Sequence, residues 1–177
     1  TLRERRKAML RFVHLSADLL RHQHSIEAMS VALADLPGAG PADGLPLVVT
    51  LSAGQVAAMT DTLADAIAPL LGQGCRLAVA DVGGDASFRL LADLPARYLQ
   101  IAPTLVHRLP ESARVRTIVG GITRIAAELD VVTIARPVEA TVTCNLLRGL
   151  GVHWGQGRLF APPSEPLAED RVKRRAG

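Results

Sequence analysis

Four polar residues follow predicted strands and could carry chemistry at one edge of a sheet. Asp81 lies at the end of the apolar stretch 76–82, Arg136 and Glu139 follow 131–135, and Gln156 precedes a glycine. A carboxylate is the kind of ligand that hard divalent cations prefer, and an arginine suits a phosphate group. We therefore treat Asp81, Arg136, Glu139 and Gln156 as candidate ligand-binding residues.

These candidates also have purely structural interpretations. Asp81 could cap the glycine turn at 83–84 or pair with Arg136, which could instead form a salt bridge with Glu139. Glu139, in the first turn of a predicted helix, is favourable with the helix dipole whatever its function. His14, a lone histidine at a strand end, could bind a transition metal or be hydrogen-bonded in the rim of the sheet.

The elements expected to position these residues alternate along the chain. Apolar runs predict strands at 11–16, 47–51, 76–82, 98–102, 131–135 and 152–155, and periodic stretches predict helices at 18–36, 55–71, 87–93, 112–129 and 137–149. Ser16 or Asp18 is expected to cap the first of these helices, and Pro137 to start the last. Nearly continuous apolar strands are typical of a parallel sheet that is covered on both faces.

This order predicts an α/β fold with about six parallel strands, flanking helices and right-handed crossovers. Such a chain forms an open doubly wound sheet or most of a barrel, and it is about two strands short of a complete eight-stranded barrel. The long helix 112–129 is expected to carry one apolar stripe, formed by Val115, Ile118, Val119, Ile122, Ile125, Ala126 and Leu129.

Composition bounds the kind of protein. The 177 residues suit one domain, and 49% of them are apolar. The net charge of +3 arises at the ends, because residues 8–170 hold 12 basic against 16 acidic side chains. A mildly acidic body argues against nucleic-acid binding. The basic ends are solvated, or they meet a membrane surface or another domain.

The same composition sets the expected location. No run of about 18 uncharged apolar residues predicts a membrane span, and no signal peptide is visible. Cys75 and Cys144 are expected to be buried free thiols. We therefore expect a cytoplasmic protein that reaches a membrane only through other domains or its basic tails.

Several motifs, in order and spacing, resemble those of the EAL domain, the cyclic di-GMP phosphodiesterase barrel. VHLS at 13–16 resembles the family's VNLS, LVVTLS at 47–52 resembles LEITES, and ADVG at 80–83 resembles DDFG. Further along, LQIA at 99–102 resembles LKID, TIARPVEA at 133–140 resembles VIAEGVET, and QGRLF at 156–160 resembles QGYLF. The resemblance runs from about residue 11 to 163 and implies a TIM-barrel-like EAL fold that is incomplete here.

The departures bear on activity. In the family, two metal ions are held by acidic residues and an asparagine, and the segment that carries the EAL motif does not occur in this sequence. The positions equivalent to other ligands and to catalytic groups hold His14, Val48, Leu51, Ala80, Gln100, Ala102 and Arg136. Among the metal-ligand positions only Asp81 keeps its type, and Glu139 and Gln156 also remain as in the family. Two-metal hydrolysis needs two cations clamped about 4 Å apart, so we expect no metal site, no cofactor, no catalytic residue and no enzymatic activity.

The resemblance thus implies a degenerate EAL module that regulates cyclic di-GMP signalling through protein–protein contacts. The alternative is a non-catalytic cyclic di-GMP receptor, for example in flagellar or biofilm control, in which Gln156 could touch a guanine edge. We expect a protein partner or a homo-oligomer, with the open end of the barrel covered by the N-terminal helix, another chain or a further segment. The expected organisation is a charged N-terminal helix at 1–10, the EAL-like domain at 11–163 and a basic tail at 164–177.

Overall fold

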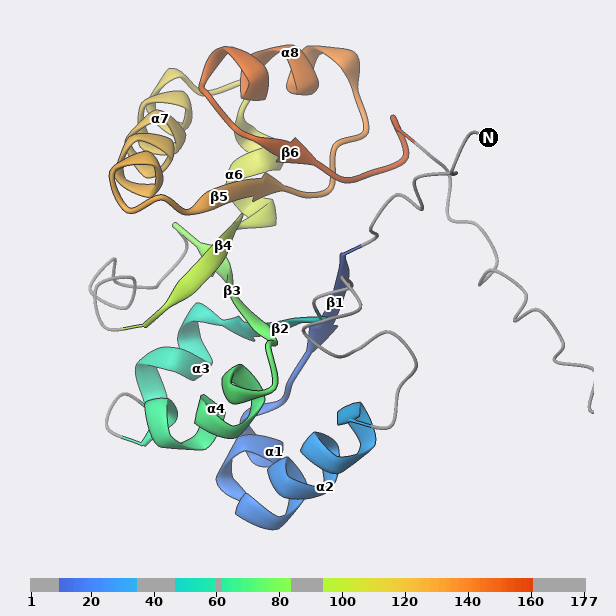
Figure 1. Ribbon diagram of the computed structural model, residues 1–177. Helices are drawn as coiled ribbons and strands as arrows, with labels where there is room; N and C mark the ends of the chain where they lie inside the picture. The colour runs from blue at the N-terminus through green and yellow to red at the C-terminus, as the bar shows by residue number, and fades with distance from the viewer. Residues whose placement is uncertain (1–9, 35–46, 60–61, 84–93, 161–177) are drawn as a thin grey trace, which may run out of the picture.

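The computed structural model describes residues 10–34, 47–59, 62–83 and 94–160 (Figure 1). Its strands are β1 Arg11–His14, β2 Leu47–Ser52, β3 Arg76–Val82, β4 Ala96–Ile101, β5 Val132–Ala135 and β6 Trp154–Gly155. Its helices are α1 Ala17–Arg21, α2 Gln23–Ala34, α3 Ala53–Ala58, α4 Leu63–Gly72, α6 Pro103–Arg108, α7 Ala113–Glu128 and α8 Thr141–Gly149. The expected helices at 2–10 and 87–93 and the basic tail lie outside the described residues.

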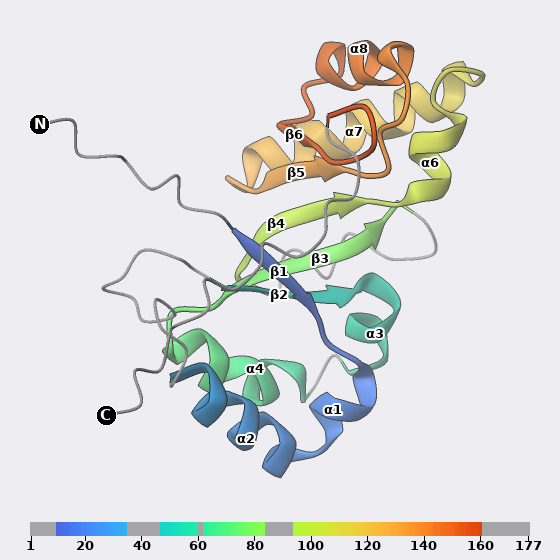
Figure 2. The same cartoon turned by 90° about the vertical axis from the view of Figure 1, so that its right-hand side faces the viewer.

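The strands form one parallel sheet in the order β1-β2-β3-β4-β5-β6. Each strand pairs with the next strand along the chain, so β1 and β6 are the two edges of the sheet. The sheet curls into a half-barrel, with the helices on its convex side (Figures 1 and 2). The six parallel strands and the partial barrel agree with the sequence-based prediction.

The two faces of the sheet carry separate hydrophobic clusters. The larger cluster joins the helices to the convex face through strand residues such as Leu51, Leu77 and Leu99, which have exposed fractions of 0–1%. The smaller cluster lies on the concave face and contains Val48, Ala78, Tyr98 and Ile134. Burial on both faces explains why these strands are nearly continuous apolar runs.

Two of the predicted helices are each divided in two. The stretch 18–36 contains α1, which is capped by the Ser16 side chain, and α2, with His22 in an extended conformation between them. The stretch 55–71 contains α3 and α4, because the chain turns at Met59, whose carbonyl accepts from Thr62 and Leu63. This turn lets both Met59 and Leu63 reach the core.

The sequence analysis missed α6, although Pro103 occupies the first turn, where proline is favoured. The predicted helix start at Pro137 is wrong, and α8 begins at Thr141. The reason lies in Val138, whose N–H donates to the Gln156 carbonyl and whose own carbonyl accepts from Leu159 N–H. This backbone pairing holds the chain extended before the helix.

Three further expectations can be compared with the structure. The last strand is shorter than predicted and contains two residues, Trp154–Gly155. Cys75 and Cys144 are free thiols, but both are half-buried rather than fully buried. Among the described residues, no helix is long and apolar enough to cross a membrane.

Candidate functional site

The C-terminal ends of the strands form the mouth of the half-barrel, which is where α/β barrels place their binding residues. β1 ends at His14, β3 reaches Asp81, β5 leads into Arg136, and β6 leads into Gln156. Arg136 is the residue that connects this region. It contacts His14, and it shares a hollow with Gln156.

Arg136 and His14 meet across the mouth of the half-barrel. Their side-chain atoms Nη2 and Nε2 are 2.9 Å apart. A guanidinium only donates hydrogen bonds, so the histidine must be neutral and must accept through Nε2. The salt bridges predicted for Arg136, with Asp81 or Glu139, are not formed. His14 is hydrogen-bonded in the rim, as one of its two sequence-based interpretations expected.

The electrostatics of His14 agree with a neutral ring. Partial burial lowers the pKa of His14 below its ordinary value of 6.5, the positive charge of Arg136 lowers it further, and the negative charge of Asp81 opposes the shift. Desolvation and a like charge both disfavour the protonated form. The contact with Arg136 is therefore one that neutral or mildly alkaline pH preserves.

Asp81 lies in the mouth, near the C-terminal end of β3. Its φ of 61° is in the left-handed region, and it sits in an irregular stretch of the β3–β4 pairing between Val79 and Val82. Its carboxylate is exposed and forms no hydrogen bond or ion pair in the part of the chain that the structure describes. The predicted cap of the glycine turn is thus absent there.

Glu139 forms an ion pair with Arg158 rather than with Arg136. Its Oε1 lies 2.8 Å from Arg158 Nη2, and both side chains are substantially exposed. The residue precedes α8, whose N-cap is Ala140, so it is not in the first helical turn as predicted. An exposed pair of this kind contributes about 0–1 kcal/mol. It holds the segment before α8 close to the turn that follows β6.

A hollow of about 390 Å³ opens beside Arg136. Its lining residues are Pro103, Arg136, Pro137, Gln156 and Gly157. The backbone of Gln156 is fixed, because its N–H donates to the Ala135 carbonyl and its carbonyl accepts from Val138. Its side chain remains exposed, so the guanidinium and the amide are available to a ligand.

Two polar side-chain atoms of the sheet are buried, which the sequence analysis did not predict. Thr50 Oγ1 on β2 and Gln100 Oε1 on β4 have no hydrogen-bond partner among the described residues. Thr50 is aligned with His14 on β1, and Gln100 with Ile134 on β5. Each polar residue lies between two apolar neighbours along its strand, which is the signal that could have indicated its burial.

The sequence and the fold of this chain are similar to those of known proteins. A family model of the EAL domain matches residues 1–163. The chain belongs to the EAL domain family. It is 31% identical, over 103 residues, to a cyclic di-GMP phosphodiesterase of Pseudomonas aeruginosa, an alignment that covers 57% of this chain and 18% of that protein. The chain thus matches less than a fifth of this relative's length.

Solved structures show the same fold. The FimX EAL domain of Pseudomonas aeruginosa, bound to cyclic di-GMP, matches with a TM-score of 0.74 at 24% identity, covering 86% of this chain and 62% of that one. BlrP1 of Klebsiella pneumoniae, in a calcium and cyclic di-GMP complex, matches with a TM-score of 0.74 at 22% identity, covering 86% and 38%. The chain therefore spans less than two thirds of these two structures.

The EAL family implies a pair of divalent cations at the mouth, and the residues present do not fit them. Val48 and Ala80, at positions where the motif resemblance implies ligands, are apolar and have exposed fractions of 0% and 1%. Nowhere in the described ranges do three His, Cys, Asp or Glu residues gather as a metal site would require. Thr50 and Gln100 add only neutral oxygens, whereas Mg²⁺ and Ca²⁺ sites usually include several carboxylates.

Proposed function

We propose that this EAL domain is a catalytically inactive regulatory module of cyclic di-GMP signalling in the cytoplasm. It acts through contacts with a protein partner or with further copies of itself. Membership of the EAL family ties the chain to cyclic di-GMP signalling. The observation that carries the proposal of inactivity is the contact between His14 and Arg136, at two positions where the resemblance implies an asparagine and a glutamate.

This contact is incompatible with a cation at the same place. A guanidinium keeps its positive charge at any physiological pH, and it occupies the acceptor nitrogen of the histidine. A divalent cation beside it would meet a fixed like charge, which the carboxylate of Asp81 opposes. Hydrolysis by two clamped metal ions needs several ligands, and no cluster of three His, Cys, Asp or Glu residues occurs among the described residues.

The test is a turnover assay. The purified 177-residue chain is incubated with cyclic di-GMP and Mg²⁺ or Mn²⁺, and the linear and mononucleotide products are measured by chromatography. We expect no product above the blank, with an active EAL phosphodiesterase as the positive control. Metal-dependent product that scales with protein concentration, and is lost in Asp81→Asn, would refute the proposed inactivity.

A second function is favoured by the hollow beside Arg136. A relative of the same fold, the FimX EAL domain, is bound to cyclic di-GMP. Arg136 and Gln156 here offer a guanidinium and an amide at the edge of one hollow, which suits a phosphate and a base edge. The alternative is therefore a receptor that binds cyclic di-GMP without cleaving it.

Calorimetric titration with cyclic di-GMP separates the two functions. Receptor function predicts saturable binding that weakens at least about tenfold in Arg136→Ala, since charge-assisted hydrogen bonds contribute about 1.5–3 kcal/mol. The matched control is Arg124→Ala, which removes an exposed arginine of α7. No heat at high ligand concentration would leave regulation through protein contacts as the supported function.

A further inference from the structure

A cavity of about 200 Å³ lies between helix α8 and the edge strand β6. α8 lies over β6 at one end of the curled sheet (Figures 1 and 2). Among the described residues, the cavity shares no lining residue with the hollow beside Arg136. The proposed function therefore makes no use of this cavity.

The floor of the cavity is apolar. Val138 and Leu147, with exposed fractions of 0% and 4%, belong to the larger hydrophobic cluster, and Val152 packs against that cluster. An apolar cavity of about 150 Å³ can hold benzene, so this space is large enough for one ring with a small substituent. Drug-sized ligands usually occupy pockets of at least about 300 Å³, which limits the occupant to a small molecule.

The ring of Phe160 forms one wall of the cavity. Phe160 lies in the turn after β6 and folds back over Gly155, where an added Cβ would lie 2.9 Å from Phe160 Cε2. The glycine thus leaves the space that the ring occupies. Because the Phe160 side chain is still 54% exposed, part of its ring remains available to stack on a planar molecule.

Two hydrogen-bond donors line the same cavity. The backbone N–H of Thr133 donates to His153 Nδ1 at 3.1 Å, so the neutral imidazole carries its proton on Nε2. Within the described residues, neither this Nε2–H nor the guanidinium of Arg148 has a hydrogen-bond or ion-pair partner. An arginine can bind a carboxylate through two parallel hydrogen bonds. The polar side of the cavity therefore favours an anion.

Other occupants use only part of this lining. Cys144 and His153 are both possible metal ligands, but the described ranges contain no group of three His, Cys, Asp or Glu residues. A bare phosphate would leave the apolar floor unused. A neutral aromatic molecule would leave the guanidinium of Arg148 without a partner. A molecule with a ring and a carboxylate uses both parts.

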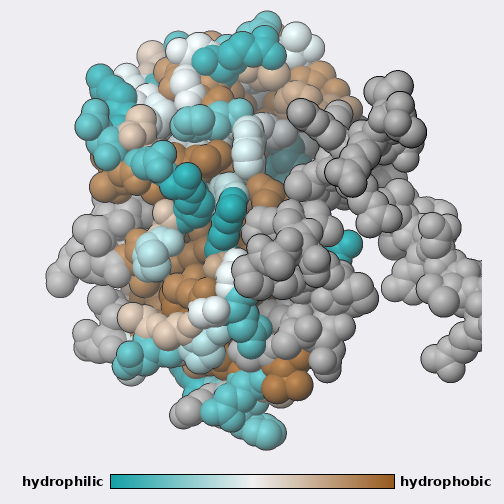
Figure 3. All heavy atoms as spheres, viewed as in Figure 1, coloured by the Kyte–Doolittle hydropathy of each residue, from teal (hydrophilic) through white to brown (hydrophobic). Residues whose placement is uncertain are grey.

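We propose that this cavity binds a small aromatic carboxylate, which is a single planar ring that carries one carboxyl group. The ring lies on the apolar floor beside Phe160, and the carboxylate accepts hydrogen bonds from Arg148 and from His153 Nε2. Arg148 is exposed, so the carboxylate lies at the rim of the cavity. Apolar (brown) and hydrophilic (teal) surfaces lie side by side in the region of α8, as such a ligand requires (Figure 3).

The thiol of Cys144 can report whether the cavity is occupied. The chain has two cysteines, both half-buried free thiols, of which Cys144 lines the cavity and Cys75 does not. The 177-residue chain is alkylated with iodoacetamide, a small neutral reagent, at increasing benzoate concentrations, and each site is followed by peptide mass spectrometry. We expect benzoate to slow the alkylation of Cys144 saturably and to leave Cys75, the internal control, unchanged.

Matched ligands and variants separate the two parts of the site. Acetate lacks the ring and benzamide lacks the charge, and each should protect Cys144 at least about tenfold more weakly than benzoate. Arg148→Gln should weaken the protection by benzoate at least about tenfold, because it removes the charge-assisted hydrogen bonds. Arg124→Gln, which removes an exposed arginine of α7, is the matched control and should behave like the parent. Rates with and without benzoate are compared within each variant, and circular dichroism confirms that each variant is folded.

The proposal is overturned if benzoate does not protect Cys144 or slows both cysteines equally. It is also overturned if acetate or benzamide protects as well as benzoate, or if Arg148→Gln is protected like the parent or no less than Arg124→Gln. A Cys144 that does not react even without benzoate would show that small molecules do not enter the cavity, which would overturn it as well. None of these results depends on cyclic di-GMP, so the proposed inactivity is tested separately.

Discussion

At the mouth of the half-barrel, the contact between His14 and Arg136 decides how the site responds to protons. The neutral imidazole accepts a hydrogen bond from the guanidinium. Protonation would remove the acceptor and place two positive charges side by side. The contact joins the end of β1 to the segment that follows β5, so its loss would remove a link between two segments that are distant in sequence.

This contact predicts a pH dependence of stability. Burial and Arg136 lower the pKa of His14 below 6.5, so the unfolded chain binds this proton more readily than the folded one. The contribution of His14 is therefore complete above pH 6.5 and is lost as the pH falls below that value. Urea unfolding between pH 5 and 8 should show a shallower acid-side loss in His14→Asn than in the parent.

The control for this measurement is His24→Asn, which removes an exposed histidine of α2. Its pH profile should run parallel to that of the parent. A His14→Asn profile that is likewise parallel to the parent would mean that the contact with Arg136 does not bias protonation.

At the scale of the element, the turn after β3 depends on a glycine. Gly83 has a φ of 88°, and a Cβ there would lie 2.6 Å from both Ile122 Cδ1 and Leu105 Cδ1. The turn therefore packs the end of β3 closely against side chains of α7 and α6. The resemblance to the DDFG motif identified this glycine, but only the packing explains its requirement.

Gly83→Ala should lower the free energy of unfolding by about 1–3 kcal/mol, because an alanine is strained at positive φ and its methyl group would displace two core side chains. Gly54→Ala is the matched control, since α3 leaves open space at that glycine. In a helix this change should stabilise by up to about 1 kcal/mol. Chemical denaturation measures both, and equal effects would contradict the packing argument.

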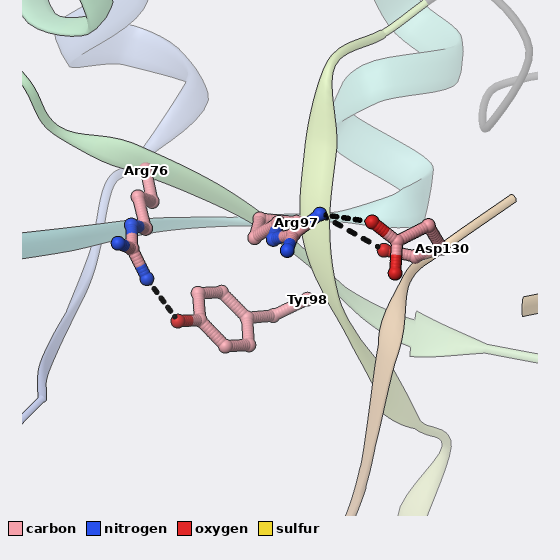
Figure 4. A network of polar contacts seen from close by, with 4 residues as sticks. All are labelled: Arg76, Arg97, Tyr98 and Asp130. Carbon is pink, nitrogen blue, oxygen red and sulfur yellow. Dashed lines mark hydrogen bonds and ion pairs between the residues drawn. The ribbon is translucent and has the colours of Figure 1, made fainter. Parts of the chain in front are cut away.

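At the scale of the whole molecule, aromatic contacts join the two edges of the sheet across the concave face. Tyr98 on β4 contacts Phe12 on β1 and Trp154 on β6, with ring centroids 5.6 Å apart in each pair. Tyr98 Oη also accepts a hydrogen bond of 3.0 Å from Arg76, while the adjacent Arg97 binds Asp130 (Figure 4). Side chains, rather than a closed ring of strands, thus fill this part of the half-barrel.

Tyr98→Ala should destabilise the chain by about 3–5 kcal/mol, because it removes a ring that is 2% exposed and is packed against both edge strands. Tyr98→Phe keeps the ring and loses only the hydrogen bond to Arg76, which predicts a loss of about 0.5–1.5 kcal/mol. Urea denaturation distinguishes the two variants. If both variants lost the same amount, the hydrogen bond to Arg76 and not the aromatic packing would account for the contribution of Tyr98 to stability.

The local pattern of apolar residues was sufficient to predict part of the fold. Apolar runs such as 47–51 and 76–82 are typical of strands buried on both faces, so the apolar pattern predicted a parallel sheet, while the barrel-like arrangement of the strands came from the resemblance to the EAL family. The divided helices and the start of α8 could not be predicted from local pattern. Each depends on a backbone contact with a residue distant in sequence or on a turn between two buried side chains.

The sequence by itself determined the family and the alternation of strands and helices along the chain, because side-chain chemistry and periodicity are properties of the residues themselves. The tertiary structure alone decided that Arg136 binds His14 rather than Asp81 or Glu139, and that Ile118, Ile125 and Leu129 face outwards. Partner choice and exposure depend on distances between segments that are far apart along the chain. Those distances are set by how the whole sheet curls.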